Sequence, residues 1–208
     1  PLTALKLQAE QALRSESLPA MRASVIEFQQ SAQRTVRLAN QLLLLSRAEP
    51  EAQTDANHDL IDLKMLAFET SREWVFRALS KGFDLGFDEA SEPAFVMVDA
   101  ALVREAINNL LDNALNYCTA GARVNVSVFV HAGSGCIAVD DSGPGIEPAD
   151  RDRITQRFQR GHSVEAEGSG LGLAIVREIA KVHSGRLVVQ SSALGGARFE
   201  LHFPLHSD

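Results

Sequence analysis

The distribution of glycine constrains this chain more than any other feature, because all 14 glycines follow residue 50 and none precedes it. A glycine-free segment of this length favours helix, in whose interior glycine costs about 1 kcal/mol relative to alanine. Apolar residues recur there on helical stripes, first at Leu2, Leu5, Ala9 and Ala12, and later at Phe28, Leu38, Leu42 and Leu45. Between these stripes, Ser17 and Pro19 provide a capping residue and a first-turn residue for a second helix. We therefore expect residues 1–50 to form an antiparallel helical hairpin.

The two arms of this hairpin differ in length. At 1.5 Å per residue the second arm, from Ala20 to Ala48, would span about 42 Å and the first only about 24 Å. The first arm begins at a proline, so we expect its missing part to lie upstream of residue 1. Two helices cannot enclose a core, and a second hairpin from another protomer would complete a four-helix bundle. A hairpin packed on the rest of its own chain is the alternative.

Charge and composition exclude several classes of protein. The 20 basic and 27 acidic residues give a net charge of −7, which disfavours a nucleic-acid partner because phosphate binding needs clustered Lys and Arg. Residues 1–50 carry a net +2, which leaves −9 for residues 51–208. With 45 % apolar and 23 % charged residues the chain is globular, and no apolar run approaches the roughly 20 residues of a membrane span. Cys118 and Cys136 are expected as small reduced thiols, although they could pair.

Residues 51–58 are polar and lack periodicity, so they are expected to be a linker. Beyond them the pattern alternates between strands and helices. The expected strands are Asp59–Leu63, Phe83–Phe87, Phe95–Val98, Arg123–His131, Cys136–Val139, Arg186–Ser191 and Arg198–Phe203. The expected helices are Lys64–Lys81, Ala100–Tyr117 and Leu171–His183. The fold class is therefore α+β, with a helical hairpin followed by a two-layer α/β sandwich over residues 59–208.

The expected helix Ala100–Tyr117 carries a row of polar side chains opposite its apolar face. Glu105, Asn109 and Asn113 are spaced by four residues, which places one carboxylate and two carboxamides on one side of the helix. Three aligned oxygens can hold a hydrated Mg²⁺ and orient a hydroxyl for deprotonation. A solvated helix face explains the spacing equally well when it is taken alone.

A second motif follows the expected strand Cys136–Val139. Asp141 is succeeded by Gly143 and Gly145, so the backbone can approach a planar ligand while the carboxylate accepts hydrogen bonds from an exocyclic amine. The alternative is an ordinary turn of Asp, Gly and Pro.

A third motif, Gly168-Ser-Gly170-Leu171-Gly172, opens the last expected helix. Glycines ahead of a helix N-terminus expose N–H groups to an anion. The preceding polar segment, Glu147–Glu167, contains four arginines, at positions 151, 153, 157 and 160, and is typical of a mobile lid that handles phosphate. Arginines on a solvated surface helix are the alternative.

The order of these motifs resembles the ATP-binding catalytic domain of sensor histidine kinases, which share a superfamily with gyrase B, Hsp90 and MutL. Residues 1–50 resemble the dimerisation and histidine-phosphotransfer hairpin of the same kinases, and Pro1–Leu5 resembles the end of their phosphoacceptor motif. The resemblance covers nearly the whole chain and implies the Bergerat-type fold with a mixed sheet.

The resemblance also implies cofactors and residue roles. The cofactors would be ATP and Mg²⁺, with Glu105 as the general base or polarising carboxylate and Asn109 as the Mg²⁺ ligand. Asn113 would contact phosphate or the metal's ligands, Tyr117 would pack over the nucleoside and Asp141 would accept from the adenine amine. The remaining nucleotide-binding residues would be Gly143, Gly145, Phe158, Arg160, Gly168, Gly170, Leu171 and Gly172.

The function implied is transfer of the ATP γ-phosphoryl to a histidine, and then to an aspartate on a response-regulator receiver domain. The acceptor histidine would lie five residues before Pro1, so this chain is expected to bind ATP without phosphorylating itself. The hairpin would form a homodimer. The protein would be the cytoplasmic segment of a bacterial sensor anchored in the inner membrane.

The chain departs from the family pattern at Asn116, where lysine is common, and at Thr155, where phenylalanine is usual; both could weaken nucleotide binding. Two other functions stay open. One is a pseudo-kinase that serves for docking and dimerisation, and the other is a serine kinase of the anti-sigma type.

Overall fold

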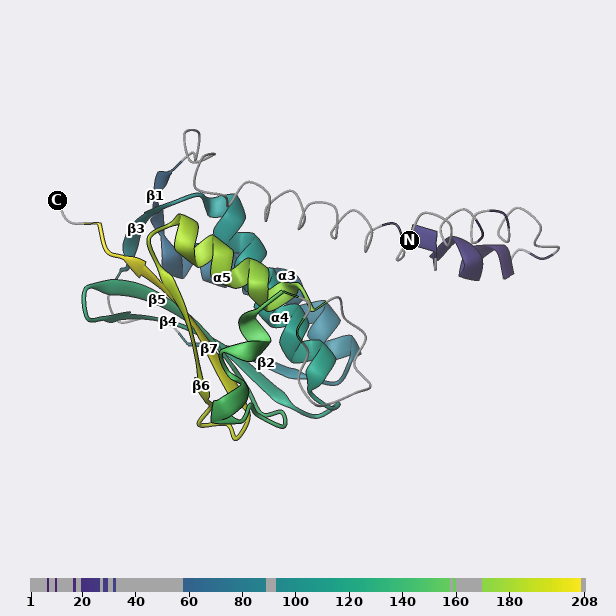
Figure 1. The fold of residues 1–208 in the computed structure, drawn as a ribbon. Helices are drawn as coiled ribbons and strands as arrows, with labels where there is room; N and C mark the ends of the chain where they lie inside the picture. The colour runs from purple at the N-terminus through teal and green to yellow at the C-terminus, as the bar shows by residue number, and fades with distance from the viewer. Residues whose placement is uncertain are drawn as a thin grey trace. The chain divides into compact units, whose positions relative to one another are not determined.

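The computed structural model divides the chain into two units, Pro1–Glu49 and Pro50–Asp208, which are described separately (Figure 1). In the second unit it describes residues 58–88, 93–157, 159 and 170–206. In the first unit it describes residues 7, 10, 17, 20–26, 28, 29 and 32.

In the first unit, residues 20–26 are helical and begin where the sequence predicts a second helix. The Ser17 carbonyl accepts a hydrogen bond from Met21 N–H at 2.9 Å, and Ser17 Oγ accepts from Ala20 N–H at 3.4 Å. Ser17 is therefore the capping residue that the sequence indicates. Most of the expected hairpin, and residues 51–57 of the expected linker, lie outside the described residues.

The second unit contains a five-stranded mixed sheet in the order β2-β4-β5-β7-β6. The strands are β2 (Asp84–Asp88), β4 (Arg123–His131), β5 (Ser134–Asp141), β6 (Arg186–Ser191) and β7 (Ala197–Pro204). β2 runs parallel to β4, and the other neighbours are antiparallel. The turn at Ala132 and Gly133 joins β4 to β5, so these strands form the hairpin that the sequence predicts.

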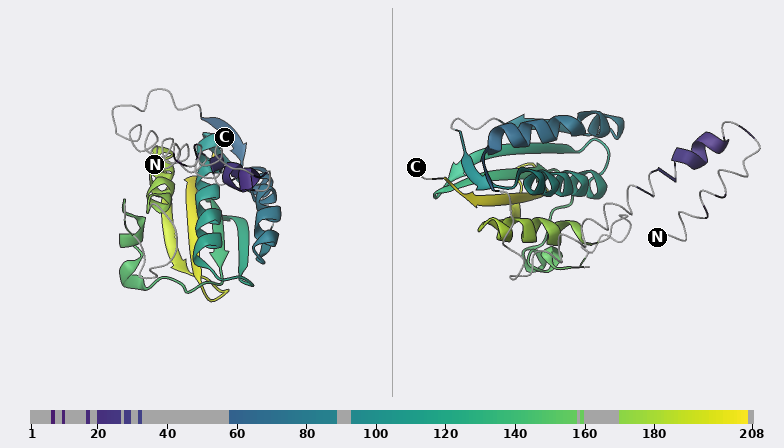
Figure 2. Two further views of the ribbon diagram at one scale, coloured as in Figure 1. Left: turned by 90° about the vertical axis from the view of Figure 1, so that its right-hand side faces the viewer. Right: turned by 90° about the horizontal axis from the view of Figure 1, so that it is seen from above.

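Three helices cover one face of this sheet: α3 (Leu63–Ser80), α4 (Ala100–Tyr117) and α5 (Gly172–Val182). Figure 2 shows them side by side in front of the strands, with α4 in the middle. Asp62 caps α3 and Asp99 caps α4, each by accepting backbone N–H bonds. Apolar side chains of the helices and of the facing sheet surface form the core, among them Leu63, Ile107, Leu110, Leu111, Ile137, Ile175, Ile179, Phe199, Leu201 and Phe203. The predicted two-layer α/β sandwich is confirmed.

The remaining strands, β1 (Asp59–Asp62) and β3 (Phe95–Val98), pair with each other as a separate antiparallel sheet, with Asp59 opposite Val98. Every predicted element in this unit is present, and its bounds agree with the prediction within two residues. Within the described ranges, no helix combines the length and the apolar character needed to cross a membrane.

Candidate nucleotide-binding site

A cavity of about 250 Å³ opens between the C-terminal end of α4, the end of β5 and the start of β7. Four residues predicted for the site line it: Asn113, Tyr117, Asp141 and Gly145. Its other lining residues are Cys118, Pro144, Ile146, Glu147, Asp150, Ile154, Gln159, Leu173, Ala197 and Phe199. The walls are thus largely apolar with a few polar groups, which is the usual character of a small-molecule site.

Asp141, the last residue of β5, is the best-anchored polar group of the cavity. Its Oδ1 accepts hydrogen bonds from Gly143 N–H at 2.8 Å and from Ala197 N–H at 3.1 Å. Its backbone carbonyl accepts from Gly196 N–H at 3.1 Å. Because two amides fix one oxygen, the orientation of the carboxylate is set, and its other oxygen can accept a hydrogen bond from a ligand.

Cys118, which follows α4, places a half-buried thiol beside Asp141. Burial, the neighbouring Asp141 carboxylate and its hydrogen bond with the thiol together raise the pKa of Cys118 to about 12. A Cβ at Gly143 would lie 2.5 Å from Cys118 Sγ and 3.0 Å from Asp141 Oδ1. Glycine at 143 therefore allows the loop to fold closely over the carboxylate. Both cysteines are free thiols, as the sequence predicts.

The predicted polar row is present along α4. Asn109 Nδ2 donates to the Glu105 carbonyl at 2.8 Å and to Glu105 Oε1 at 3.1 Å. Glu105, Asn109 and Asn113 are all half-buried, so the row is not a freely solvated helix face. Asn113 and Tyr117 line the cavity and Glu105 does not, which places the carboxylate of the row away from the cavity walls.

The donor atoms of this row fit Mg²⁺ bound together with a nucleotide. In the part of the chain that the structure describes, no group of three or more His, Cys, Asp or Glu side chains could hold a metal. Mg²⁺ in phosphoryl-transfer sites takes only one or two protein oxygens and fills its remaining positions with phosphate oxygens and water. Glu105 and Asn109 supply oxygens of that type.

The N-terminus of α5 lies next to the same row. A Cβ on Gly172, the first residue of α5, would be 3.4 Å from Asn109 Oδ1. The capping residue Leu171 makes no side-chain cap, and Gly170 before it has a φ of +68°. The first-turn N–H groups and the helix dipole are therefore placed to bind an anion near Asn109.

Three predicted site residues, Phe158, Arg160 and Gly168, lie outside the described residues. Two lid arginines make contacts within the protein: Arg151 donates to Ser191 Oγ at 2.9 Å, and Arg153 pairs with Asp150 at 3.0 Å. These contacts hold the short 3₁₀ turns η2 (Pro148–Asp150) and η3 (Arg153–Thr155) in place.

The two departures from the family pattern have clear contacts. Thr155 is buried, and its Oγ1 donates to the Asp152 carbonyl at 2.9 Å and accepts from Arg177 at 3.3 Å. Asn116 Nδ2 donates to Asp112 at 3.2 Å, and its Oδ1 accepts from Lys81 at 3.4 Å. Neither side chain lines the cavity.

Sequence reasoning missed the contribution of the turn between β6 and β7. Ala197 lines the cavity, and Gly196 packs so closely on Asp141 that a Cβ would lie 2.5 Å from Gly143 N and 2.6 Å from the Asp141 carbonyl. The pair Gly195-Gly196 before the last strand was the available signal. The sequence predicts Cys118 only as a reduced thiol and does not indicate that it lines the cavity.

Comparisons with known proteins identify the family of this chain. The family model of the histidine kinase-, DNA gyrase B- and HSP90-like ATPases matches residues 98–207. The sensor histidine kinase RppB of Synechocystis sp. is 32 % identical over all of this chain and 46 % of its own length. The sensor protein kinase PmrB of Pseudomonas aeruginosa is 33 % identical over 90 % of this chain and 39 % of its own length. It thus spans about half the length of the curated relatives, or less.

Two solved structures of histidine kinases have the same fold. AdeS of Acinetobacter baumannii matches with a TM-score of 0.75 at 20 % identity, over 100 % of this chain and 96 % of that chain. Full-length ShkA in complex with AMPPNP matches with a TM-score of 0.77 at 25 % identity, over 99 % of this chain and 44 % of that chain. The chain therefore belongs to the histidine kinase-, DNA gyrase B- and HSP90-like ATPase family, and its relatives in that family are two-component sensor histidine kinases.

Proposed function

We propose that this chain binds ATP with Mg²⁺ and forms the kinase core that transfers the γ-phosphoryl to a histidine of its own protein. The observation that carries the proposal is the Asp141 carboxylate, which lines an apolar cavity and has one oxygen fixed by the Gly143 and Ala197 amides. The phosphohistidine would then donate to an aspartate of a response-regulator receiver domain.

Adenine would be recognised at Asp141. Its second oxygen accepts a hydrogen bond from the exocyclic amine of adenine, whereas guanine presents a carbonyl oxygen at the equivalent position and is repelled. Tyr117, Ile146 and Phe199 offer apolar surface for the faces of the base. ATP would be selected over GTP because the ionised Asp141 carboxylate can only accept hydrogen bonds and cannot donate one to the guanine carbonyl.

The triphosphate would lie along α4 towards the N-terminus of α5. Asn113 would contact phosphate, and Asn109 would supply a metal ligand. The backbone of Gly170, Leu171 and Gly172 would bind the phosphates, and Gly168, Phe158 and Arg160 are further candidates from the sequence. Bound Mg²⁺ would neutralise charge on the phosphates as the γ-phosphoryl leaves. Glu105, oriented by its 3.1 Å hydrogen bond from Asn109, would polarise the attacking imidazole.

The phosphoacceptor histidine of this proposal lies upstream of residue 1, and residues 1–50 provide the dimerisation hairpin. The chain alone would then bind ATP and leave its own histidines unmodified. Of those described, His183 and His202 are buried, and their ring nitrogens lie within hydrogen-bonding distance of other groups of the protein.

The proposal is tested by thermal unfolding with ATP·Mg²⁺ and with GTP·Mg²⁺. A ligand at a hundred times its Kd stabilises the native state by about 2.7 kcal/mol, which for a chain of this size raises Tm by roughly 5–10 °C. We expect this shift with ATP and not with GTP.

The matched variant is Asp141→Asn, which keeps the oxygen that accepts from Gly143 and Ala197 and replaces the second oxygen with an amide donor. We expect it to lose the ATP shift while its own Tm changes little. Equal shifts with both nucleotides, or an ATP shift that survives in Asp141→Asn, would place the base elsewhere. No shift with either nucleotide would favour the pseudo-kinase function.

A further inference from the structure

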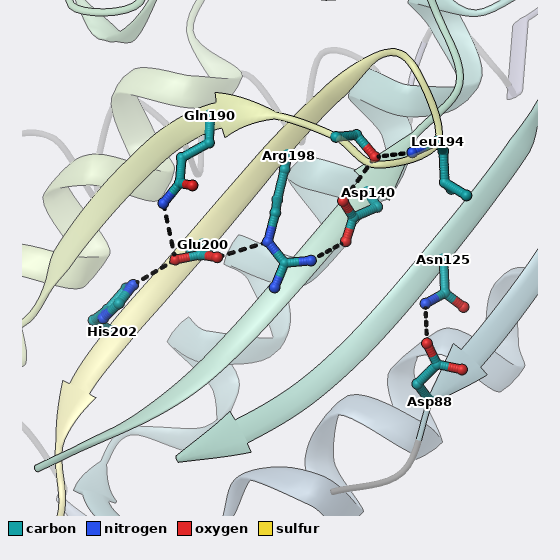
Figure 3. Close-up of polar contacts among 9 residues, drawn as sticks. Asp88, Asn125, Asp140, Gln190, Leu194, Arg198, Glu200 and His202 are labelled. Carbon is teal, nitrogen blue, oxygen red and sulfur yellow. Dashed lines mark hydrogen bonds and ion pairs between the residues drawn. The ribbon is translucent and has the colours of Figure 1, made fainter. Parts of the chain in front are cut away.

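A polar network crosses the sheet face that lies opposite the helices. Successive residues of a strand point to opposite faces, so Asp140 of β5 and Arg198, Glu200 and His202 of β7 share the open face, while Asp141 lines the cavity on the helix side. Figure 3 shows Asp140, Arg198, Glu200 and His202 in a row, joined by hydrogen bonds and ion pairs. Asp140, Glu200 and His202 are at most 7 % exposed, although none of the helices described in this unit covers this face.

The network ends at the turn that joins β6 to β7. Asp140 Oδ1 accepts a hydrogen bond from Ser192 Oγ at 2.7 Å, and Asp140 Oδ2 pairs with Arg198. Ser192 Oγ in turn accepts from Leu194 N–H at 3.0 Å. Both Asp140 and Ser192 are buried, so a lost partner here would leave an unsatisfied polar group.

The same turn supplies the donors that orient Asp141. Ser192 N–H donates to the Gly196 carbonyl at 2.9 Å, which closes the turn. Gly196 N–H and Ala197 N–H then donate to the Asp141 carbonyl and to Asp141 Oδ1, each at 3.1 Å. Two consecutive residues therefore hold one turn from opposite faces of the sheet. The Asp140 carboxylate accepts from Ser192 Oγ, whereas Asp141 accepts from Ala197 N–H with its carboxylate and from Gly196 N–H with its backbone carbonyl.

From this geometry we infer that Ser192 and Asp140 are positioning residues for nucleotide recognition. They do not line the cavity. They fix the turn that leads into Ala197, whose N–H donates to Asp141 Oδ1 and so helps to set the orientation of that carboxylate. The inference rests on the proposed function of Asp141 as the acceptor for the adenine amine. It adds Asp140 and Ser192, on the opposite face of the sheet, as side chains that fix the orientation of the Asp141 carboxylate.

The primary variant is Ser192→Ala, which removes one hydroxyl and no charge, and Ser192→Thr is the variant that restores the hydroxyl. The matched control is Asn125→Ala, which removes the Asn125 Nδ2 to Asp88 Oδ2 bond of 2.6 Å, a contact on the same sheet face that does not involve the turn (Figure 3). Affinities are measured by calorimetry for ATP·Mg²⁺ and for the triphosphate of purine riboside, which lacks the exocyclic amine.

We expect Ser192→Ala to weaken ATP binding about fivefold and to leave binding of the amine-free triphosphate unchanged. Ser192→Thr should restore ATP affinity, and Asn125→Ala should not alter it. In the Asp141→Ala background, adding Ser192→Ala should have no further effect, because the two residues act through one hydrogen bond to the base. An equal loss for both triphosphates, or a loss that persists without Asp141, would overturn the inference.

A second measurement does not depend on nucleotide. In the ligand-free protein, Ser192→Ala should speed hydrogen exchange of the Gly196 and Ala197 amides about fivefold, while Asn125→Ala leaves both rates unchanged. Unchanged exchange in Ser192→Ala would refute the coupling whatever the protein binds. If exchange is faster in Ser192→Ala but the wild-type protein does not bind ATP, the coupling through the turn stands and the proposed function is refuted.

Discussion

His183 Nε2 accepts a hydrogen bond of 3.0 Å from the backbone N–H of Asp99, which ties the C-terminal cap of α5 to the N-terminal cap of α4. On its other side, Nδ1 lies 2.7 Å from the Ile179 carbonyl, a position that suits an Nδ1–H donor. The imidazole therefore fits this place only in its neutral form, because a second proton on Nε2 would face the Asp99 N–H. Burial accordingly lowers the pKa of His183.

This contact predicts a pH dependence of folding stability. Since the folded-state pKa lies below 6.5, the unfolded chain binds the extra proton as the pH falls, and stability is lost below that value. Between pH 7.5 and 5.5 the loss due to His183 is at most about 1.4 kcal/mol. Urea unfolding followed by the fluorescence of Trp74, the single tryptophan, measures it.

We expect His183→Gln to be less stable than the wild type at pH 7.5 but to lose less stability between pH 7.5 and 5.5. As a control, His206→Gln at an exposed position should change neither the stability nor its pH dependence. An identical pH dependence in wild type and His183→Gln would contradict this account.

Glu200 gives a second prediction, at lower pH. Burial would raise the pKa of this carboxyl, but hydrogen bonds from Arg198 and His202 outweigh burial and lower it. Its contribution to stability is therefore present above about pH 4.5 and lost as the pH falls through the lower, folded-state value. Glu200→Gln should lower the free energy of unfolding by about 1–3 kcal/mol at pH 7. It should also make that free energy fall less steeply as the pH is lowered.

The measurement is the free energy of unfolding between pH 6 and 3.5, with the more exposed Glu73→Gln as control. Acid sensitivity that is the same in wild type and Glu200→Gln would show that other carboxyls dominate.

Gly196 gives a third prediction, because it is where the β6–β7 turn meets Asp141. An added methyl group would overlap Asp141 Oδ1 and lie 2.5 Å from Gly143 N, and backbone atoms cannot move aside cheaply. Gly196→Ala should therefore destabilise the protein by about 1–3 kcal/mol and abolish the ATP-dependent rise in Tm.

Gly195→Ala is its control: it has a φ of +103° and open space around its Cβ, so it should cost about 1–2 kcal/mol and keep the response to ATP. Retained ATP binding in Gly196→Ala would show that Asp141 tolerates displacement.

The thiol of Cys118 gives a fourth prediction. With a pKa of about 12, the thiolate fraction at pH 8 is about 10⁻⁴, so iodoacetamide should alkylate it about 10³-fold more slowly than an ordinary exposed cysteine. ATP should slow the reaction further at Cys118 and not at Cys136, which is buried in β5 and lies outside the cavity. Peptide mass spectrometry separates the two sites, and the chain unfolded in urea provides the reference rate. Fast labelling of Cys118 in the folded protein would contradict the arrangement described for this thiol.

The sequence predicted the elements of the second unit well because their signals are local. α4 shows why: a wide apolar face, the Asp99 cap and the four-residue spacing of Glu105, Asn109 and Asn113 all lie within one helix. The pairing of the strands was harder to predict from the sequence. β2 pairs in parallel with β4 across the whole of α4, and β1 pairs with β3 outside the main sheet, and neither follows from periodicity.

The parts of the site that depend on long-range contacts could not be predicted. Ala197 donates to Asp141 from 56 positions further along the chain, and no pattern near Asp141 indicates its partner. Arg151 and Arg153, in the segment expected to handle phosphate, contact Ser191 and Asp150 in this structure, and their role towards phosphate stays a prediction. The roles of Phe158, Arg160 and Gly168 stay predictions.

The placement of Asp140 and Asp141 on opposite faces of β5 has a consequence for insertions and deletions. A one-residue slip of β5 against β7 would exchange the two carboxylates. It would turn Asp141 away from the cavity to the opposite sheet face and bury Asp140, the partner of Arg198, in the apolar layer. An inserted residue between Ser134 and Asp140 therefore removes both functions of the strand at once. An insertion in the Ala132–Gly133 turn leaves the register intact, so length variation among relatives should gather in that turn and spare the strand that follows.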